Sequence, residues 1–123
     1  MIDHKKDWIG VDFDGTLAFY DKWHGPTHLG EPLPEMVSRV KQWIAEDKNV
    51  RIFTARCYSP IDDAIAQREA AMALLAMQEW CLKHLGAVLP ITCVKDYGMT
   101  EFWDDRAVQM EKNTGKPIKS RGE

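Results

Sequence analysis

The stretch Trp8–Leu17 reads WIGVDFDGTL, and it decides the fold of this 123-residue chain. It opens as a short apolar run of strand-forming type, which stops abruptly at Asp12 and Asp14. Run length and composition predict a buried strand with both carboxylates at its carboxyl end, where open α/β sheets bind ligands. Gly15 permits a sharp turn just there, so the two acids could approach one small centre from different angles.

Two carboxylates in such a place form a hard, anionic oxygen site. Mg²⁺ suits it, because this ion needs only one or two carboxylates and takes water and substrate phosphate as its other ligands. One acid could then attack phosphorus and form an aspartyl-phosphate, while the other protonates the leaving oxygen and later activates water. The alternative is a strand ending in a solvated turn, since Asp and Gly are common turn residues. An EF-hand fits worse, because the twelfth residue counted from Asp12 is Trp23 instead of Glu.

Length and composition predict one globular domain over residues 1–123, with a core at about 7–113 and a polar tail at 114–123. Hydrophobic residues make up 45% and charged residues 28%, as in ordinary soluble proteins. The net charge of -3 shows no strongly basic nucleic-acid surface. No apolar run is long enough for a membrane span, and the polar start is no signal peptide, so we expect a cytoplasmic protein without membrane contact.

Strand-like and helix-like segments alternate along the chain. The strands are expected at residues 7–11, 50–54, 89–94 and 99–103, and the helices at 33–47, from Ser59 or Pro60 to His84, and at 106–113. This alternation predicts an α/β fold, a Rossmann-like parallel sheet with helices on both faces. The second helix is apolar almost all round in its middle, so we expect it to be well buried or shared with a partner, which leaves room for a homodimer.

Residues 18–33 are rich in Gly and Pro and predict an irregular flap near the strand ends. Its aromatic residues either lie over a substrate or only hold a long loop to the body; they are Phe19, Tyr20 and Trp23. His24 and His28 have metal-like spacing, but without a further Cys or acid cluster nearby they are interpreted as exposed loop histidines. The three cysteines, Cys57, Cys81 and Cys93, lack C-x-x-C spacing and are expected to be free thiols.

Each of the four predicted strands runs into a polar group. In chain order these groups are Asp12 with Asp14, Thr54, Lys95, and Asp104 with Asp105. Because the carboxyl ends of parallel strands meet at one edge of a sheet, we expect these side chains to converge there.

In this order the strand ends resemble the motifs of the haloacid-dehalogenase (HAD) superfamily of phosphohydrolases. Residues 11–17 match its first motif, D-x-D-G-T-L after a hydrophobic strand, and residues 52–54 match its second, a strand ending in Thr or Ser. Lys95 fits the third motif, a lone basic residue, and residues 102–105 fit the fourth, an apolar run ending in paired acids. The resemblance spans about residues 8–110.

The resemblance implies a Mg²⁺-dependent phosphatase that works through an aspartyl-phosphate. Asp12 would be the nucleophile and Asp14 the general acid and base, with its backbone carbonyl also on the metal. Thr54 would hydrogen-bond the transferring phosphoryl group, and Lys95 would hold that group and balance the charge on Asp12. Positioning and charge neutralisation are what phosphoryl transfer chiefly needs.

The implied Mg²⁺ site comprises Asp12, Asp14, Asp104 and Asp105. Gly15 and Thr16 of the first motif are expected to bind substrate. Arg56 could clamp a second phosphate or a substrate carboxylate through its planar fork, although a surface salt bridge is equally open. Arg106 could pair with one acid of the 104–105 pair.

Neither gap between the motifs has room for a folded cap domain, so the resemblance is to the capless branch of the family. Its open site suits a bulky substrate or closure by a neighbouring subunit. The chain is also loosely similar to the phosphatase half of phage polynucleotide kinases. It has no Walker A sequence that could supply a kinase half. The substrate remains open among phosphorylated small molecules, such as nucleotides and sugar phosphates, and nucleic-acid ends. The alternatives are a receiver-type phospho-acceptor module and a catalytically silent binding module on the same scaffold.

Overall fold

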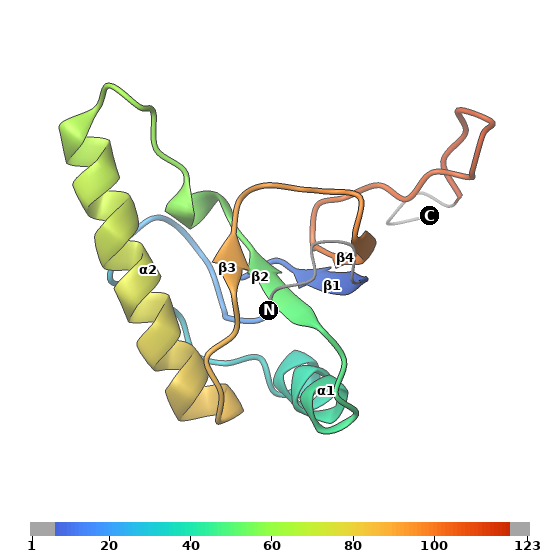
Figure 1. Ribbon diagram of the computed structural model, residues 1–123, viewed down its shortest axis with the longest axis horizontal. Helices are drawn as coiled ribbons and strands as arrows, with labels where there is room; N and C mark the ends of the chain where they lie inside the picture. The colour runs from blue at the N-terminus through green and yellow to red at the C-terminus, as the bar shows by residue number, and fades with distance from the viewer. Residues whose placement is uncertain (1–6, 119–123) are drawn as a thin grey trace.

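The structure is a computed structural model that describes residues 7–118. It contains a four-stranded sheet in the order β3-β2-β1-β4, and every neighbouring pair of strands is parallel (Figure 1). The strands are β1 (Trp8–Val11), β2 (Val50–Phe53), β3 (Ile91–Thr92) and β4 (Met99–Trp103). The predicted α/β Rossmann-like parallel sheet is therefore confirmed, with a third strand shorter than expected.

Helix α1 (Pro34–Ala45) lies where the sequence predicts it. Pro34 occupies the first turn, where its missing N–H costs nothing. Met36, Val40 and Trp43 recur at helical spacing and are buried, so this stripe attaches the helix to the core.

Helix α2 (Ala64–Leu85) begins later than the predicted start at Ser59 or Pro60, which was wrong. Asp63 is the N-cap, and its side chain accepts a hydrogen bond of 2.9 Å from the backbone N–H of Ala66. An aspartate is at least as good a cap as a serine, and here the later of two competing caps is used. Gly86 ends the helix with φ of 77°, as expected for a left-handed C-cap.

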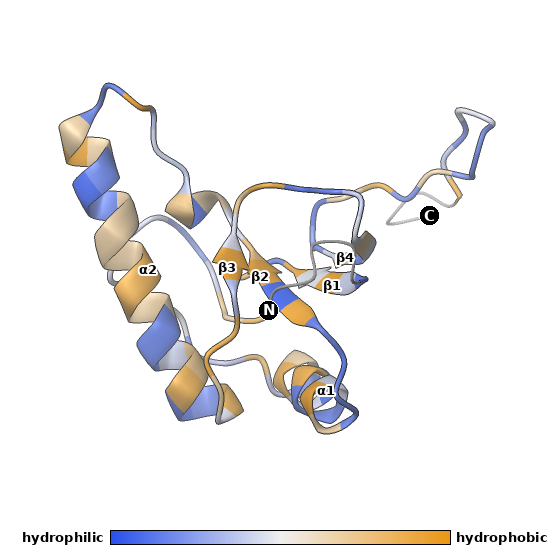
Figure 2. Cartoon of the chain, in the orientation of Figure 1, coloured by the Kyte–Doolittle hydropathy of each residue, from blue (hydrophilic) through white to orange (hydrophobic). Residues whose placement is uncertain are grey.

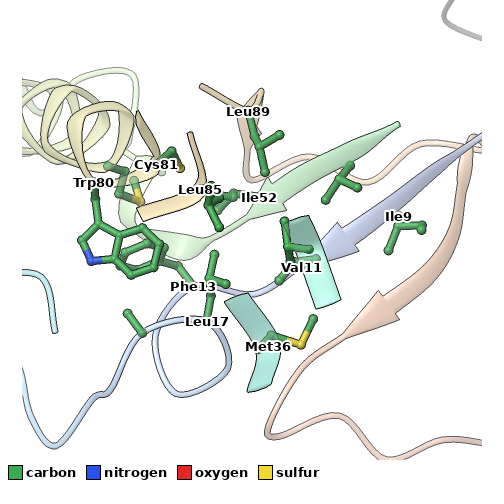
Figure 3. Close-up of a cluster of buried hydrophobic side chains, with 14 of the residues drawn as sticks. Ile9, Val11, Phe13, Leu17, Met36, Ile52, Trp80, Cys81, Leu85 and Leu89 are labelled. Carbon is green, nitrogen blue, oxygen red and sulfur yellow. The ribbon is translucent and has the colours of Figure 1, made fainter. Parts of the chain in front are cut away.

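Both helices pack on the same face of the sheet. Alternate residues of β1 and β2 point to that face and form one core with residues of α1 and α2 (Figure 3). The strand members of this core are Ile9, Val11, Val50 and Ile52, and the helical members include Met36, Val40, Met77, Trp80 and Cys81. The turn after β1 adds Phe13 and Leu17, which anchors the first motif in the same core.

The prediction of helices on both faces is not met within residues 7–118, because the second face of the sheet has no helix there. A right-handed crossover from β3 to β4 would place its connection on that face, but residues 93–98 are too few for a helix. The loop covers the face directly: the indole Nε1 of Trp8 donates to Asp96 Oδ1 at 2.8 Å, and the Arg51 guanidinium lies 4.6 Å from the Trp8 ring.

The predicted helix at residues 106–113 is also wrong. Residues 109–118 instead form a small antiparallel turn, in which Met110 bridges Pro117 and Glu111 N donates to Lys116 O at 2.7 Å. Asn113, at φ of 64°, supplies a left-handed turn position that ends any helix. The expected polar start at residues 1–6 and the last tail residues, 119–123, lie outside the described part. No helix in residues 7–118 has the length and apolarity to cross a membrane.

Candidate active site

The register of the sheet brings acids from the two ends of the chain together. Val11 of β1 is aligned with Trp103 of β4, and the backbone N–H of Asp12 donates to Trp103 O at 2.9 Å. Asp12 and Asp104 each follow directly after one of these aligned residues. They therefore emerge side by side at the carboxyl edge of the sheet, as the sequence predicts for parallel strands.

Three carboxylates gather at this edge. Asp12, Asp104 and Asp105 each offer an oxygen, and these oxygens all lie within 4.8 Å of one another. Burial, followed by repulsion from Asp104 and hydrogen bonds to Asp104 and Asp105, raises the pKa of Asp12 from 3.8 to about 8. The cluster thus concentrates more negative charge than these side chains readily carry together, which is the condition under which a cation binds well.

The turn of the first motif packs against this cluster. Gly15 has φ of 85°, and a Cβ there would lie 2.6 Å from Asp105 Oδ2, so only glycine fits without a shift. The Thr16 hydroxyl lies 3.5 Å from both Asp12 Oδ2 and Asp105 Oδ1. These two predicted substrate-binding residues thus border the acids and help to position them.

Asp104 is fixed from the other side. Its Oδ2 accepts hydrogen bonds from the backbone N–H groups of Arg106, at 2.8 Å, and Ala107, at 2.7 Å. This turn fixes the Asp104 carboxylate immediately after β4, beside the other two acids of the cluster.

Asp14 is held apart from the cluster by Arg56. The guanidinium donates from Nε to Asp14 Oδ2 at 2.7 Å and from Nη2 to Asp14 Oδ1 at 2.9 Å. Its remaining N–H groups donate to the backbone carbonyls of the flap at Gly25, Pro26 and His28, over 3.2–3.4 Å. All five donors of the fork are thereby used, and Arg56 joins the first motif, the second motif and the flap.

This arrangement differs from both sequence-based readings of Arg56. The residue is 9% exposed, so its ion pair is not a surface salt bridge. Its donors are engaged within the chain, so in this arrangement none points to a second phosphate. The carboxylate of Asp14, predicted as a metal ligand, is likewise outside the three-acid cluster.

Thr54 lies buried at the carboxyl end of β2, as predicted. Its hydroxyl oxygen accepts a hydrogen bond of 3.2 Å from the Arg56 backbone N–H. A hydroxyl can accept and donate at once, and within residues 7–118 this O–H has no acceptor, so it can donate to a ligand. Thr54 lines the same cavity as Asp12 and Asp14.

That cavity has a volume of about 490 Å³ and lies at the carboxyl edge of the sheet. Its lining includes three of the aspartates, Asp12, Asp14 and Asp104. It also includes three aromatic residues, Tyr20 and Trp23 from the flap and Tyr58 from the segment before α2. Two of the three flap aromatics, Tyr20 and Trp23, therefore line the cavity, whereas Phe19 is not among its lining residues and is exposed.

Sequence reasoning missed two residues that line this cavity. They are Glu69 of α2 and Tyr58, which follows the short 3-10 helix η1 (Ala55–Cys57). Arg106 also lines the cavity, whereas the sequence suggested it only as a partner for the 104–105 acids. The local pattern does not indicate these positions, because they depend on how α2 and the segment after β4 pack at the edge of the sheet.

Lys95 is not brought to the acids. The side chain is exposed and lines a separate pocket of about 340 Å³ with Phe53, Met99 and Phe102 on the second face of the sheet. Strand β3 ends at Thr92, aligned with Phe53, so Lys95 lies three residues beyond the edge, in the loop that crosses that face.

The remaining predicted candidates stay outside the acid cluster. His24 and His28 are exposed, with ring centroids 4.6 Å apart, and His24 Nε2 lies 3.0 Å from Asp21 Oδ1. The three cysteines are free, as expected. Cys81 is fully buried in the core, and this burial raises the pKa of its thiol to about 11.

Comparison with known proteins adds little to this geometry. No family model matches the chain, and no curated protein matches it. A solved structure of a conserved protein from Bacteroides thetaiotaomicron is similar, with 21% sequence identity and a TM-score of 0.49, over 84% of this chain and 78% of that one. A likeness at this level carries no argument about activity.

Proposed function

We propose that this chain is a Mg²⁺-dependent phosphatase of the HAD type, which hydrolyses a phosphate monoester through an aspartyl-phosphate on Asp12. The observation that carries the proposal is the convergence of Asp12, Asp104 and Asp105 to within 4.8 Å at the carboxyl edge of a parallel sheet. A solvated turn after β1 would leave the first acid without the other two. The cavity beside the acids supplies the space for a substrate.

The donor set fits Mg²⁺, which prefers carboxylate oxygens. Asp12, Asp104 and Asp105 would hold the ion. Burial and, after it, repulsion from Asp104 raise the pKa of Asp12, and a dication would oppose both effects by favouring the ionised carboxylate. When bound, Mg²⁺ would neutralise charge on the transferring phosphoryl group. The Asp14 carboxylate does not join this set in the described arrangement, which leaves its backbone carbonyl as the proposed contact.

The chain's own residues account for the remaining steps. An oxygen of Asp12 attacks phosphorus, the bond from phosphorus to the leaving oxygen breaks, and Asp14 gives that oxygen a proton. Water then attacks phosphorus of the aspartyl-phosphate and gives a proton back to Asp14, while the bond from phosphorus to the Asp12 oxygen breaks and inorganic phosphate leaves. Thr54 donates its hydroxyl to the phosphoryl group. For Asp14 to act, one of its oxygens must leave the Arg56 fork, so movement of the flap and the chemistry are linked.

The aromatic residues that line the cavity support a substrate with a flat ring. Tyr20, Trp23 and Tyr58 offer surfaces on which an aryl group or a nucleobase can stack. Among the substrates left open by the sequence, this lining favours nucleotides and nucleic-acid ends over small sugar phosphates. Arg56 and Arg106 both line the cavity, but the donors of Arg56 are engaged within the chain, so Arg106 is the better placed of the two to meet the phosphate.

The test is turnover of an aryl phosphate with Mg²⁺ and with a chelator, for the natural protein and for Asp12→Asn. Asp47→Asn, an exposed substitution beyond α1, serves as the control. We expect metal-dependent turnover that only Asp12→Asn abolishes. If Asp12→Asn turns over the aryl phosphate as fast as the natural protein, Asp12 is not the nucleophile. A long-lived aspartyl-phosphate without turnover would instead favour the receiver-type module.

A panel of nucleotides, sugar phosphates and oligonucleotides with terminal phosphates would then rank the substrates. We expect ring-bearing substrates to have the higher kcat/KM. A preference for small sugar phosphates would contradict the role given to the aromatic lining without affecting the proposed reaction.

A further inference from the structure

We infer that two copies of this chain associate through the outer side of α2, with the two helices antiparallel about a two-fold axis. The inference is independent of the proposed reaction. Helix α2 carries large apolar residues on two opposite sides.

The inner side of α2 packs against the rest of the chain. Its buried residues are Ala70, Ala73, Met77, Trp80, Cys81 and Leu85. The outer side also carries large apolar residues, but they are exposed: Ile65 at 74%, Met72 at 43%, Leu75 at 62% and Leu82 at 60%. Figure 1 shows α2 at the edge of the molecule with no other element on that side, and Figure 2 shows hydrophobic residues along much of its length. A helix that is apolar on both sides is typical of one covered on both sides.

The outer residues follow the spacing of a helix–helix seam. Taken with Arg68 and Glu79, they stand at positions 65, 68, 72, 75, 79 and 82, alternately three and four residues apart. These are the a and d positions of a heptad repeat, of which four hold apolar residues and two hold charged residues. A scatter of exposed apolar residues on an ordinary surface helix has no reason to keep this pattern.

The pattern is self-complementary when the second helix runs in the opposite direction. With the two-fold axis between residues 73 and 74, Met72 faces Leu75 of the partner subunit, and Ile65 faces Leu82 of the partner subunit. The same axis places Arg68 against Glu79 of the partner subunit, and the symmetry repeats each contact. A parallel pair would set Arg68 against its own copy, which like charges oppose.

The charged pair identifies the occupant as a second copy. Within residues 7–118 neither Arg68 nor Glu79 takes part in an ion pair, so both charges remain for an external partner. An unrelated apolar helix could cover Met72 and Leu75, but it would leave these two charges against apolar surface. A second copy in the antiparallel register matches both, and polar seam positions of this kind fix register at some cost in affinity.

The seam leaves the cavity accessible. Ala66 and Glu69, which line the cavity, lie on α2 outside the positions of the seam. A single pair of helices buries an area at the low end for specific complexes, so we expect a reversible dimer with a dissociation constant in the micromolar range. Association and phosphatase activity can therefore be measured separately.

The first experiment is sedimentation equilibrium of the full chain over a range of concentrations. We expect a monomer–dimer equilibrium that Leu75→Glu weakens by about tenfold or more, because a charge then lies in the apolar seam. Lys41→Glu, an exposed charge reversal on α1, should leave the equilibrium unchanged. Circular dichroism of each variant checks that its helices are intact.

Charge reversal then tests the antiparallel register. Arg68→Glu alone and Glu79→Arg alone each place like charges together twice, so both should weaken the dimer. The double variant restores unlike pairs and should recover the affinity of the natural chain. A mixture of the two single variants should form a heterodimer tighter than either homodimer, because both of its contacts then join unlike charges.

Several results would overturn the inference. The inference fails if the natural chain stays monomeric at every concentration, whether or not another protein binds this side of α2. A dimer that neither Leu75→Glu nor Arg68→Glu weakens would place the interface elsewhere. Failure of the mixed variants to prefer each other, with both correctly folded, would exclude the antiparallel register.

Discussion

Arg56 binds Asp14 at two points, with distances of 2.7 Å from Nε to Oδ2 and 2.9 Å from Nη2 to Oδ1. The Arg56 side chain is 4% exposed and that of Asp14 is 21% exposed, so the pair is largely shielded from water. The Trp23 ring lies 4.9 Å from the same guanidinium. The guanidinium also donates hydrogen bonds to three backbone carbonyls of the flap. The second acid of the first motif and the flap thus share one anchor.

Arg56→Ala is expected to lower the free energy of unfolding by roughly 3 kcal/mol, because it leaves a shielded carboxylate and the flap carbonyls without their donors. Arg56→Lys should recover only part of this, since an ammonium cannot form the fork. Urea unfolding gives the values, and limited proteolysis within residues 19–31 reports on the flap. Lys48→Ala, which removes an exposed ion pair with Glu46, is the control and should change stability by less than about 1 kcal/mol. Equal effects of Arg56→Ala and Lys48→Ala would show that the anchor contributes nothing.

The stability of the metal-free protein should fall with rising pH because of Asp12. Its pKa is about 8 in the folded chain against an ordinary value of 3.8, so the folded state keeps a proton that the unfolded state releases. The resulting stabilisation is complete below the ordinary pKa of 3.8, and it is lost as the pH rises through the folded-state pKa of about 8. Melting temperatures in a chelator, from about pH 4 to about pH 9, should therefore decline more for the natural chain than for Asp12→Asn. Parallel curves for the two proteins would show that Asp12 titrates normally.

Gly15→Ala tests whether the turn of the first motif positions Asp105. The added methyl group must displace the Asp105 carboxylate, so we expect weaker Mg²⁺ binding by calorimetry. Gly115→Ala is the matched control, because Gly115 has φ of 77° and nothing within 4 Å of the added Cβ. Both variants should lose about 1 kcal/mol or more of stability to backbone strain. Unchanged Mg²⁺ affinity in Gly15→Ala would remove Asp105 from the proposed metal site.

Arg106 and Lys95 are the two candidates for the cation that binds the phosphate. Arg106 lines the cavity with the acids, whereas Lys95 lines the pocket on the second face of the sheet. We expect Arg106→Ala to raise KM for an aryl phosphate several-fold and Lys95→Ala to leave KM and kcat near those of the natural chain. A large loss of kcat in Lys95→Ala would show that residues 93–98 bring Lys95 to the acids during turnover, as the family resemblance implies.

Several features follow from local sequence alone. The apolar run before Asp12, the Pro34 start of α1 and the Gly86 end of α2 are all where the sequence predicts them, because strand composition and helix-end chemistry depend on a few neighbouring residues. Parallel pairing then brings Asp12 and Asp104 together, since each directly follows an aligned strand residue. The fold class and the three-acid cluster were therefore predictable without coordinates.

Other features depended on how distant segments pack. The sequence presented Asp14 and Arg56 as two independent ligand-binding residues, and only the folded chain shows that they bind each other. It placed Lys95 at a strand end, but the short loop after β3 carries that side chain over the second face, where a helix was expected. Local patterns determine which segments form strands and helices, whereas the partner of a buried charge and the face that a loop covers depend on contacts between residues far apart in the chain.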